Sequence, residues 1–174
     1  MSRGMPDEAT QTLVCLLEDI ESIKRLKARY FRCVDERAWS ELRTLFTDDC
    51  TFHSAGSREI EGPDAFIRRV AELIHPGTSV HQGHMPEITL TGATTAEGIW
   101  SMTDYVEVDP DRAGRRGLVG HGHYFENYRR EARGWVISRW DLRRTRVTRI
   151  AEGGLALLSA SSESATPTYS RRRS

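Results

Sequence analysis

Apolar residues in the first half of the chain recur at the three- and four-residue spacing of an α-helix. A first amphipathic helix, from about residue 18 to 36, is predicted from Ile20, Ile23, Leu26, Tyr30 and Val34. A short second helix is predicted from Trp39, Leu42, Leu45 and Phe46. A third helix is predicted to begin at Gly62-Pro63-Asp64, because proline is favoured in a first turn, and its buried stripe is Phe66, Val70, Leu73 and Ile74.

The second half of the chain changes to the two-residue period of β-strands. Apolar and polar residues alternate at Ile88 and Leu90, then at Trp100, Met102, Val106 and Val108, and finally at Val136, Trp140 and Leu142. Turns are predicted at Gly92, from Asp109 to Gly114, and at Gly134. Three N-terminal helices followed by long strands predict an α+β fold, with the helices packed on one face of a strongly curved, mostly antiparallel sheet.

The length of 174 residues fits one domain with a sizeable core. Residues 1–12 are largely polar and contain a glycine and a proline, which predicts a flexible N-terminal arm. Residues 153–174 begin with two glycines and become rich in serine and threonine, which predicts a disordered C-terminal tail. The folded domain is therefore expected to span residues 13–152.

Charge and cysteine content narrow the functional classes. The 25 basic and 25 acidic residues cancel, so nucleic acid and anionic membranes are not expected as partners. The terminal run Arg171-Arg172-Arg173 is interpreted as a solvated tail. No segment approaches the roughly 20 apolar residues that cross a bilayer. The three cysteines are Cys15, Cys33 and Cys50, and they lack metal-ligand spacing. An odd number argues against a set of disulfides, so a reducing cytoplasm is the expected location.

Strand alternation places one carboxylate on an otherwise apolar face. Successive side chains of a strand point to opposite faces, so one face carries Trp100, Met102, Asp104, Val106 and Val108. A charge on such a face is costly. Asp104 therefore needs a strand partner, or it must take up a proton.

The last strand carries a complementary charge. One face of this strand is predicted to carry Val136, Trp140, Leu142, Arg144 and Arg146. Arg144 then lies at the end of an apolar face, where it can form a structural salt bridge with Asp104 or bind a ligand oxygen. The neighbouring Arg143 and Arg146 leave open which arginine faces the interior.

Four further residues are candidates for acid–base chemistry. His81 and His84 are three apart, so they point to opposite faces of a regular strand unless a bulge at Gly83 changes this. Tyr30 and Asp35 are about 140° apart on an ideal helix, so they share a pocket only near the helix end. Histidine changes its charge most easily near neutral pH. Each of these residues also has a purely structural interpretation.

His121, His123 and Glu126 form a His-x-His-x-x-Glu pattern. Two histidines on one strand face together with a carboxylate are able to bind a metal. Strand partners or surface exposure explain most such pairs, however. We therefore expect no metal, and metal dependence is kept as a third alternative.

Several segments agree in order and spacing with one known family. They are DIESIKRLKARYFRCVDERAWSELRTLFTDD, HQGHMPEI, GIWSMTDYV, GHGHYFENYRR and GWVISRWDLRRTRV, running from about Asp19 to Val147. They resemble the SnoaL-like family of the nuclear transport factor 2-like superfamily. The resemblance implies a cone-shaped α+β barrel of the cystatin-like type whose mouth admits a hydrophobic small molecule. It also implies a homodimer or homotrimer and no required cofactor.

Within that superfamily the chain resembles bile-acid dehydratase and, more distantly, scytalone dehydratase. The positions that match the catalytic set are Tyr30, Asp35, His81, Asp104 and Arg144. The resemblance implies a lyase that dehydrates a hydroxylated, polycyclic, steroid- or polyketide-like molecule. In this hypothesis His81 is the base, Asp35 orients it, Tyr30 contacts a carbonyl and Asp104 protonates the leaving hydroxyl. Arg144 either holds Asp104 or contacts the substrate.

Six other residues are expected to contact the substrate: His84, Trp100, Met102, His121, His123 and Trp140. Two alternatives remain beside the dehydratase. An isomerase or cyclase needs the same acid–base pocket, and a non-catalytic module for ligand binding or dimerisation uses the same fold.

Overall fold

The computed structural model describes residues 7–74, 77–107 and 115–151. The elements, in chain order, are α1 (Glu8–Asp35), α2 (Trp39–Arg43), β1 (Phe46–Ser54), β2 (Ile60–Glu61), α3 (Pro63–Ile74), β3 (Ser79–Leu90), β4 (Thr95–Val106), β5 (Arg115–Glu131) and β6 (Gly134–Ala151). The expected tail at 153–174, the turn at 109–114 together with Val108, and the first six residues of the expected arm lie outside the described residues.

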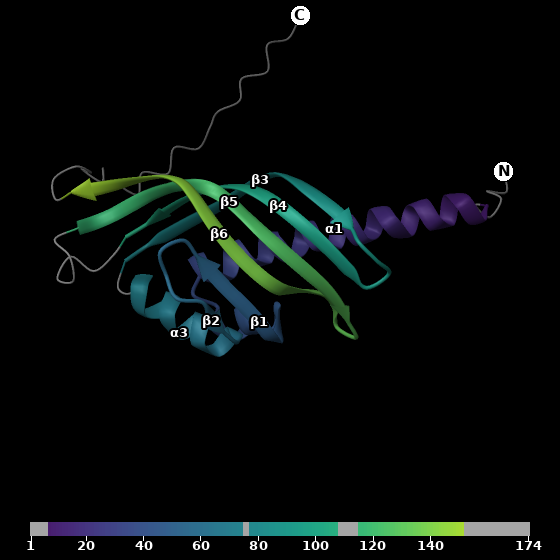
Figure 1. Cartoon of the computed structure of the whole chain (residues 1–174), viewed down its shortest axis with the longest axis horizontal. Coiled ribbons are helices and arrows are strands. Elements are labelled where there is room, and N and C mark those ends of the chain that lie inside the picture. Colours follow the sequence, from purple (N-terminus) through teal and green to yellow (C-terminus); the bar gives the residue numbers. More distant parts are fainter. Residues whose placement is uncertain (1–6, 75–76, 108–114, 152–174) are drawn as a thin grey trace, which may run out of the picture.

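All six strands form one sheet in the order β2-β1-β6-β5-β4-β3. β1 runs parallel to β6, and every other neighbouring pair is antiparallel. The sheet curls around α1, while α3 lies beside β1 and β2 (Figure 1). The predicted α+β fold with a curved, mostly antiparallel sheet is confirmed. The sheet is not closed into a full barrel, because β2 and β3 remain as its edges.

α1 begins earlier than the sequence pattern predicts. It begins at Glu8 rather than near residue 18, and the carboxylate of Asp7 caps it by accepting a hydrogen bond from the Thr10 N–H at 2.7 Å. This end of the helix extends beyond the sheet (Figure 1), and residues 8–18 are exposed. The prediction relied on a buried stripe, which begins only at Ile23.

The sequence analysis missed two strands, β1 and the two-residue β2. Phe46, expected in the second helix, instead begins β1, and α2 ends at Arg43. Asp48 and Asp49 are adjacent exposed residues within the strand, so the two-residue alternation is broken. The pairing with β6 shifts register between Phe46 and Thr51. This irregularity hides the strand period from a reading of the sequence.

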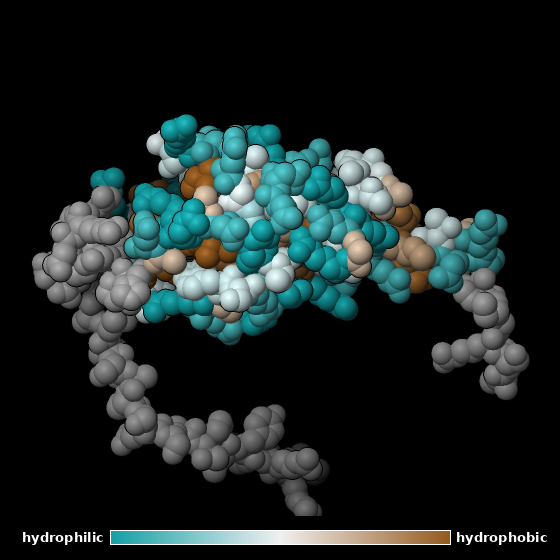
Figure 2. All heavy atoms as spheres, turned by 90° about the horizontal axis from the view of Figure 1, so that it is seen from below, coloured by the Kyte–Doolittle hydropathy of each residue, from teal (hydrophilic) through white to brown (hydrophobic). Residues whose placement is uncertain are grey.

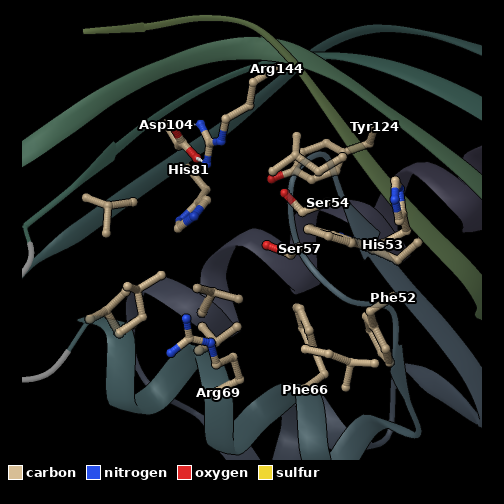
Figure 3. A pocket seen from close by; sticks show the side chains of 18 of the residues that line it. Phe52, His53, Ser54, Ser57, Phe66, Arg69, His81, Asp104, Tyr124 and Arg144 are labelled. Carbon is tan, nitrogen blue, oxygen red and sulfur yellow. Dashed lines mark hydrogen bonds and ion pairs between the residues drawn. The ribbon is translucent and has the colours of Figure 1, made fainter. Parts of the chain in front are cut away.

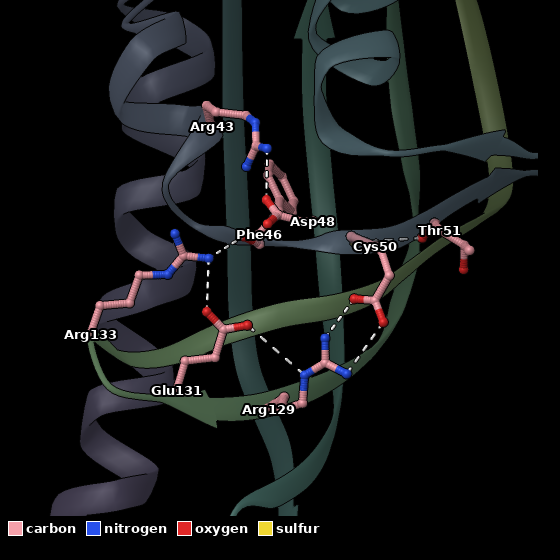
Figure 4. Close-up of polar contacts among 9 residues, drawn as sticks. Arg43, Phe46, Asp48, Cys50, Thr51, Arg129, Glu131 and Arg133 are labelled. Carbon is pink, nitrogen blue, oxygen red and sulfur yellow. Dashed lines mark hydrogen bonds and ion pairs between the residues drawn. The ribbon is translucent and has the colours of Figure 1, made fainter.

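An ion pair and a hydrogen bond connect β1 to the end of β5 and to the turn that follows it (Figure 4). The guanidinium of Arg129 pairs with Asp49, with Nη2 2.5 Å from Oδ1. Arg133 donates to the backbone carbonyl of Phe46 at 2.8 Å and pairs with Glu131 at 2.9 Å. These groups are solvent-exposed, so each pair contributes at most about 1 kcal/mol.

A register shift in β6 changes which residues face the core. The pairing with β5 shifts between Asn127 and Tyr128, which leaves Ser138 as an extra residue. Ile137 therefore joins Trp140 in the core cluster, whereas Val136 is buried as expected, at 2% exposure, but lies outside that cluster. The alternation predicted for this end of the last strand is wrong for that reason.

Aromatic side chains fill the space between the sheet and α3. Phe52 of β1 stacks on Phe66 of α3, with ring centroids 4.0 Å apart. Trp140 of β6 packs against Phe66 at 5.3 Å and against Tyr124 of β5 at 5.3 Å. Burying each such side chain contributes about 1.5–3 kcal/mol. The same rings form one wall of the cavity described next.

Candidate active site

A cavity of about 570 Å³ lies between the sheet, the last turns of α1 and α3 (Figure 3). Its walls are mainly apolar and include Val34, Phe52, Phe66, Val70, Trp140 and Leu142. Polar side chains enter it at a few positions, among them Tyr30, His81, Asp104, Tyr124 and Arg144. An apolar cavity of this size with a few polar groups is typical of a small-molecule site.

His81 and Asp35 form a hydrogen-bonded pair at one wall. Asp35 is the last residue of α1, and its Oδ1 lies 2.7 Å from Nδ1 of His81 in β3. The carboxylate also accepts hydrogen bonds from the Ser79 hydroxyl and the His81 backbone N–H, both at 2.9 Å. When this carboxylate is ionised it only accepts, and Nδ1 of a neutral ring is then the donor while Nε2 is the acceptor. These hydrogen bonds offset the unfavourable position of a negative charge at a helix C-terminus.

Arg144 and Asp104 form a bidentate ion pair beside His81. Nη1 of Arg144 lies 2.7 Å from Oδ1 of Asp104, and Nη2 donates to Oδ2. The Asp104 side chain is 1% exposed, and Asp104 is the direct cross-strand partner of His81. Although burial acts to lower it, Asp104 holds the pKa of Arg144 above its ordinary value. Because both carboxylate oxygens accept from the guanidinium, the geometry does not support the expected role of Asp104 as a proton donor.

Gly120 makes room for this ion pair. It lies opposite Asp104 in the pairing of β4 with β5. A Cβ atom at this position would overlap both the Arg144 guanidinium and the Asp104 carboxylate. The pair therefore depends on a glycine that the sequence analysis did not single out.

The structure decides which arginine of the last strand faces the cavity. Arg144 lines it, whereas Arg143 points to the other face and pairs with Asp141 at 2.9 Å. The β5–β6 register shifts again at Thr145. Arg146 is therefore paired with His121, which faces outward, and does not share the face of Arg144. The predicted common face of Arg144 and Arg146 is wrong because of this irregularity.

Tyr30, Tyr124 and Trp140 lie together in the wall of the cavity. Burial raises the pKa of Tyr30, and the negative charge of Glu126 adds to this rise, while the nearby Trp140 and Tyr124 side chains oppose it. Burial also raises the pKa of Tyr124. Both phenols are therefore protonated donors near neutral pH. Nε1 of Trp140 is buried next to Tyr30, and no hydrogen bond to it from the described residues meets the usual geometric limits.

A second buried ion pair lies behind the two tyrosines. Nζ of Lys27 is 2.5 Å from Oε1 of Glu126, and both side chains are fully buried. Nζ also lies 3.5 Å from the centroid of the Tyr124 ring, and the Tyr128 hydroxyl donates to Glu126 at 2.6 Å. Burial lowers the pKa of Lys27 to about 8 although Glu126 raises it. The sequence analysis missed this pair because its members are 99 residues apart.

Of the six residues expected to contact substrate, Trp140 lines the cavity. Trp100 and Met102 are buried in the core outside its lining, where the indole N–H of Trp100 donates to the Tyr128 hydroxyl at 2.8 Å. Three histidines lie on the opposite face of the sheet: His84, His121 and His123. A bulge at Gly83 would have brought His84 to the face of His81. The irregularity instead follows His84, between His84 and Glu87, so His84 points to the opposite face.

The His-x-His-x-x-Glu pattern is divided between the two faces of β5. Glu126 is buried on the side of Lys27, whereas His121 is exposed on the other side. Within the described ranges, no three His, Cys, Asp or Glu side chains gather as a metal site would require. The described helices also include none with the length and apolarity to cross a membrane.

Solved structures share this fold at low sequence identity. A protein of Novosphingobium aromaticivorans, proposed to be a scytalone dehydratase, is 22% identical, with 79% of this chain and 90% of that chain covered and a TM-score of 0.68. A type 2 hexachlorocyclohexane dehydrochlorinase (LinA) is 18% identical, with 82% and 96% covered and a TM-score of 0.71. LinA-type3 of Novosphingobium barchaimii is 20% identical, with 78% and 92% covered and a TM-score of 0.68.

These likenesses, all at 22% identity or less, concern the fold alone. A family-level comparison is more specific. The SnoaL-like domain matches residues 16–141, which is most of the chain and covers the larger part of α1, all elements from α2 to β5, and the beginning of β6. The chain therefore belongs to the SnoaL-like domain family.

Proposed function

We propose that this protein is a cofactor-independent acid–base enzyme, a lyase that dehydrates a hydroxylated, hydrophobic small molecule with a carbonyl group. The observation that supports it most is the His81–Asp35 pair at the wall of a mainly apolar cavity. Asp35 selects the tautomer whose Nε2 accepts a proton. The apolar walls favour a polycyclic body of the steroid or polyketide type.

In the proposed reaction, Nε2 of His81 removes the proton from the carbon next to the carbonyl. The electron pair of that C–H bond forms a C=C bond while the C–O bond to the hydroxyl breaks. Tyr30 donates a hydrogen bond to the carbonyl oxygen as negative charge develops there. The protonated His81, stabilised by Asp35, then gives its proton to the departing hydroxyl. Water leaves, and the enzyme returns to its starting state.

Arg144 and Asp104 have a supporting role in this proposal. The Arg144 side chain is 24% exposed and lines the cavity, so it is able to contact a substrate oxygen. Asp104 fixes the plane of the guanidinium through two hydrogen bonds. In this proposal the proton that leaves with the hydroxyl comes from His81 instead of Asp104.

The names of the similar structures support an elimination. A dehydratase removes water and a dehydrochlorinase removes HCl, and both names occur among proteins of this fold. Each reaction takes a proton from carbon while a group leaves from its neighbour. The choice of a hydrophobic substrate rests on the cavity of the present chain.

The proposal can be tested first without a substrate. Nitrogen-15 NMR of the histidine rings is expected to show His81 protonated at Nδ1 in the wild type, and a mixture of tautomers in Asp35→Asn. Hydroxylated polycyclic ketones are then screened by mass spectrometry for loss of one water. A product of unchanged mass would identify an isomerase or cyclase, and tight binding without conversion would identify a binding module.

We also propose that the protein is a homodimer or homotrimer. Four apolar residues on the extended end of α1 are 39–57% exposed: Leu13, Val14, Leu16 and Leu17. Figure 2 shows this hydrophobic surface at the protruding end of the molecule. Exposed apolar surface of this kind favours an interface. Light scattering is expected to give a multiple of 19.8 kDa for the wild type and a lower mass for Leu17→Glu; a monomeric wild type would contradict this.

A further inference from the structure

Two exposed arginines at the edge of the cavity have no ionic partner in the part of the chain that the structure describes. Arg58, in the turn between β1 and β2, and Arg69, on α3, both line the cavity. Among the residues that the structure describes, neither forms an ion pair or a side-chain hydrogen bond. The third arginine of the lining, Arg144, is bound by Asp104, which is the one carboxylate of the described lining. The described lining therefore carries two positive charges that no carboxylate of that lining pairs, although the whole chain has a formal charge of zero.

Polar groups accompany these two charges. Figure 3 shows Ser54 and Ser57 pointing into the cavity and Arg69 rising from α3, across the cavity from Asp104 and Arg144. Apolar residues of α3, including Phe66 and Val70, lie beside Arg69 in the lining. The cavity thus has an acid–base end at His81, an apolar middle and a cationic edge.

The chemistry of guanidinium groups indicates what this edge binds. Arginine offers planar pairs of N–H donors that match an oxyanion, and it is less strongly hydrated than lysine. Such hydrogen bonds become stronger where apolar walls exclude part of the water. A positively charged edge also attracts anions toward the cavity before they bind. A neutral hydrophobic ligand would use none of these groups.

We propose that Arg69 and Arg58 bind a carboxylate of the ligand. The ligand class is then a hydrophobic molecule with an anionic end, held at the cationic edge, while its hydroxyl and carbonyl groups reach His81. The inference deepens the proposed function at the same site and rests on it for the reacting groups. Binding of the carboxylate itself can be measured without turnover.

The test compares two fluorescent probes of similar shape, 1-pyrenebutyrate and the neutral 1-pyrenebutanol, in 50 mM NaCl. The wild type is expected to bind the carboxylate about tenfold more tightly than the alcohol, which equals about 1.4 kcal/mol. Arg69→Gln is expected to remove most of this preference, and Arg58→Gln part of it. Arg68→Gln is the matched control, because Arg68 is the neighbour of Arg69 on α3 and is exposed like it, but does not line the cavity.

Raising NaCl to 500 mM is expected to weaken binding of the carboxylate but not of the alcohol. Equal affinities of the wild type for both probes, or no binding of either, would overturn the proposal. So would an equal loss in Arg68→Gln and Arg69→Gln, which would indicate a diffuse surface charge. His81→Gln is expected to keep the preference, so the carboxylate site and the acid–base chemistry can fail separately.

Discussion

His81 with Asp35 and His53 with Asp141 are the same chemical pair in two settings. The Nδ1–Oδ1 distances are 2.7 Å and 2.9 Å. In the first pair the carboxylate comes from the end of α1, and the imidazole is 10% exposed at the cavity. In the second pair the carboxylate comes from the neighbouring strand β6, and the imidazole is 41% exposed.

The difference lies in what else each carboxylate binds. Asp141 also accepts two hydrogen bonds from Arg143, whose guanidinium covers the ring of Phe125 on the outer face of the sheet. Its charge is therefore already compensated. Asp35 has neutral partners besides His81, so its charge is available to stabilise a protonated imidazole. His53 also lines the cavity. Neither a histidine–aspartate contact nor a place beside the cavity therefore indicates catalysis by itself, and the two pairs differ in the charges around the carboxylate.

The largest effect is expected from removing one histidine at a time. His81→Gln should lower kcat/KM for a dehydrated substrate by about 10²–10⁴, because it removes the general base. His53→Gln should change it by less than about twofold. Equal losses in the two variants would show that the comparison between the pairs is wrong.

The Lys27–Glu126 pair extends the comparison to a pair whose side chains are both fully buried. Lys27→Met should lower the free energy of unfolding by about 3–5 kcal/mol, since it leaves Glu126 buried without its cation. The double variant Lys27→Met/Glu126→Gln should recover most of this loss. Urea unfolding provides the measurement, and an additive loss in the double variant would contradict the proposed pairing.

Replacing each of the two carboxylates by asparagine tests which of them supports catalysis. Asp35→Asn should lower kcat by about tenfold to 100-fold, because the tautomer and the charge that support His81 are both lost. Asp141→Asn, the matched control on the outer face, should leave kcat unchanged. Steady-state kinetics at fixed pH distinguish these outcomes, and an active Asp35→Asn enzyme would remove Asp35 from the mechanism.

The smallest effect concerns the pH dependence of stability at Asp141. Burial acts to raise the pKa of Asp141, but hydrogen bonds from His53 and Arg143 lower it below its ordinary value. Its contribution to stability is thus present above about pH 4 and is lost as the pH falls through the lower folded-state value. At pH 6 the free energy of unfolding of the wild type should exceed that of Asp141→Asn by about 2 kcal/mol. This difference should shrink below pH 4. A constant difference in urea unfolding from pH 6 to pH 2 would refute this.

Much of the fold could be read from the sequence, because local patterns encode it. The buried stripe of α1 and the Pro63 start of α3 appear as predicted. The alternation along β4 correctly placed Asp104 on the buried face with Trp100 and Met102. Regular strands keep a strict period of two, so facing is predictable where no bulge intervenes.

Irregular pairing limited the prediction of the site. Which arginine of β6 faces the cavity depends on an extra residue at Thr145. The outward position of His121 and His123 depends on which face of β5 meets α1, and alternation alone does not specify this. Both questions are decided by the partner strand, because a one-residue shift exchanges the two faces of a sheet.

The sequence by itself determined the helices, the α+β class, and the side-chain types Tyr30, Asp35, His81 and Arg144 that meet at the cavity. The tertiary structure decided which charged side chains form pairs. Lys27 meets Glu126 across 99 residues, and His53 meets Asp141 across 88. Local propensities act over a few residues, whereas the cost of burying a charge is relieved by whichever opposite charge the folded chain brings within hydrogen-bond distance.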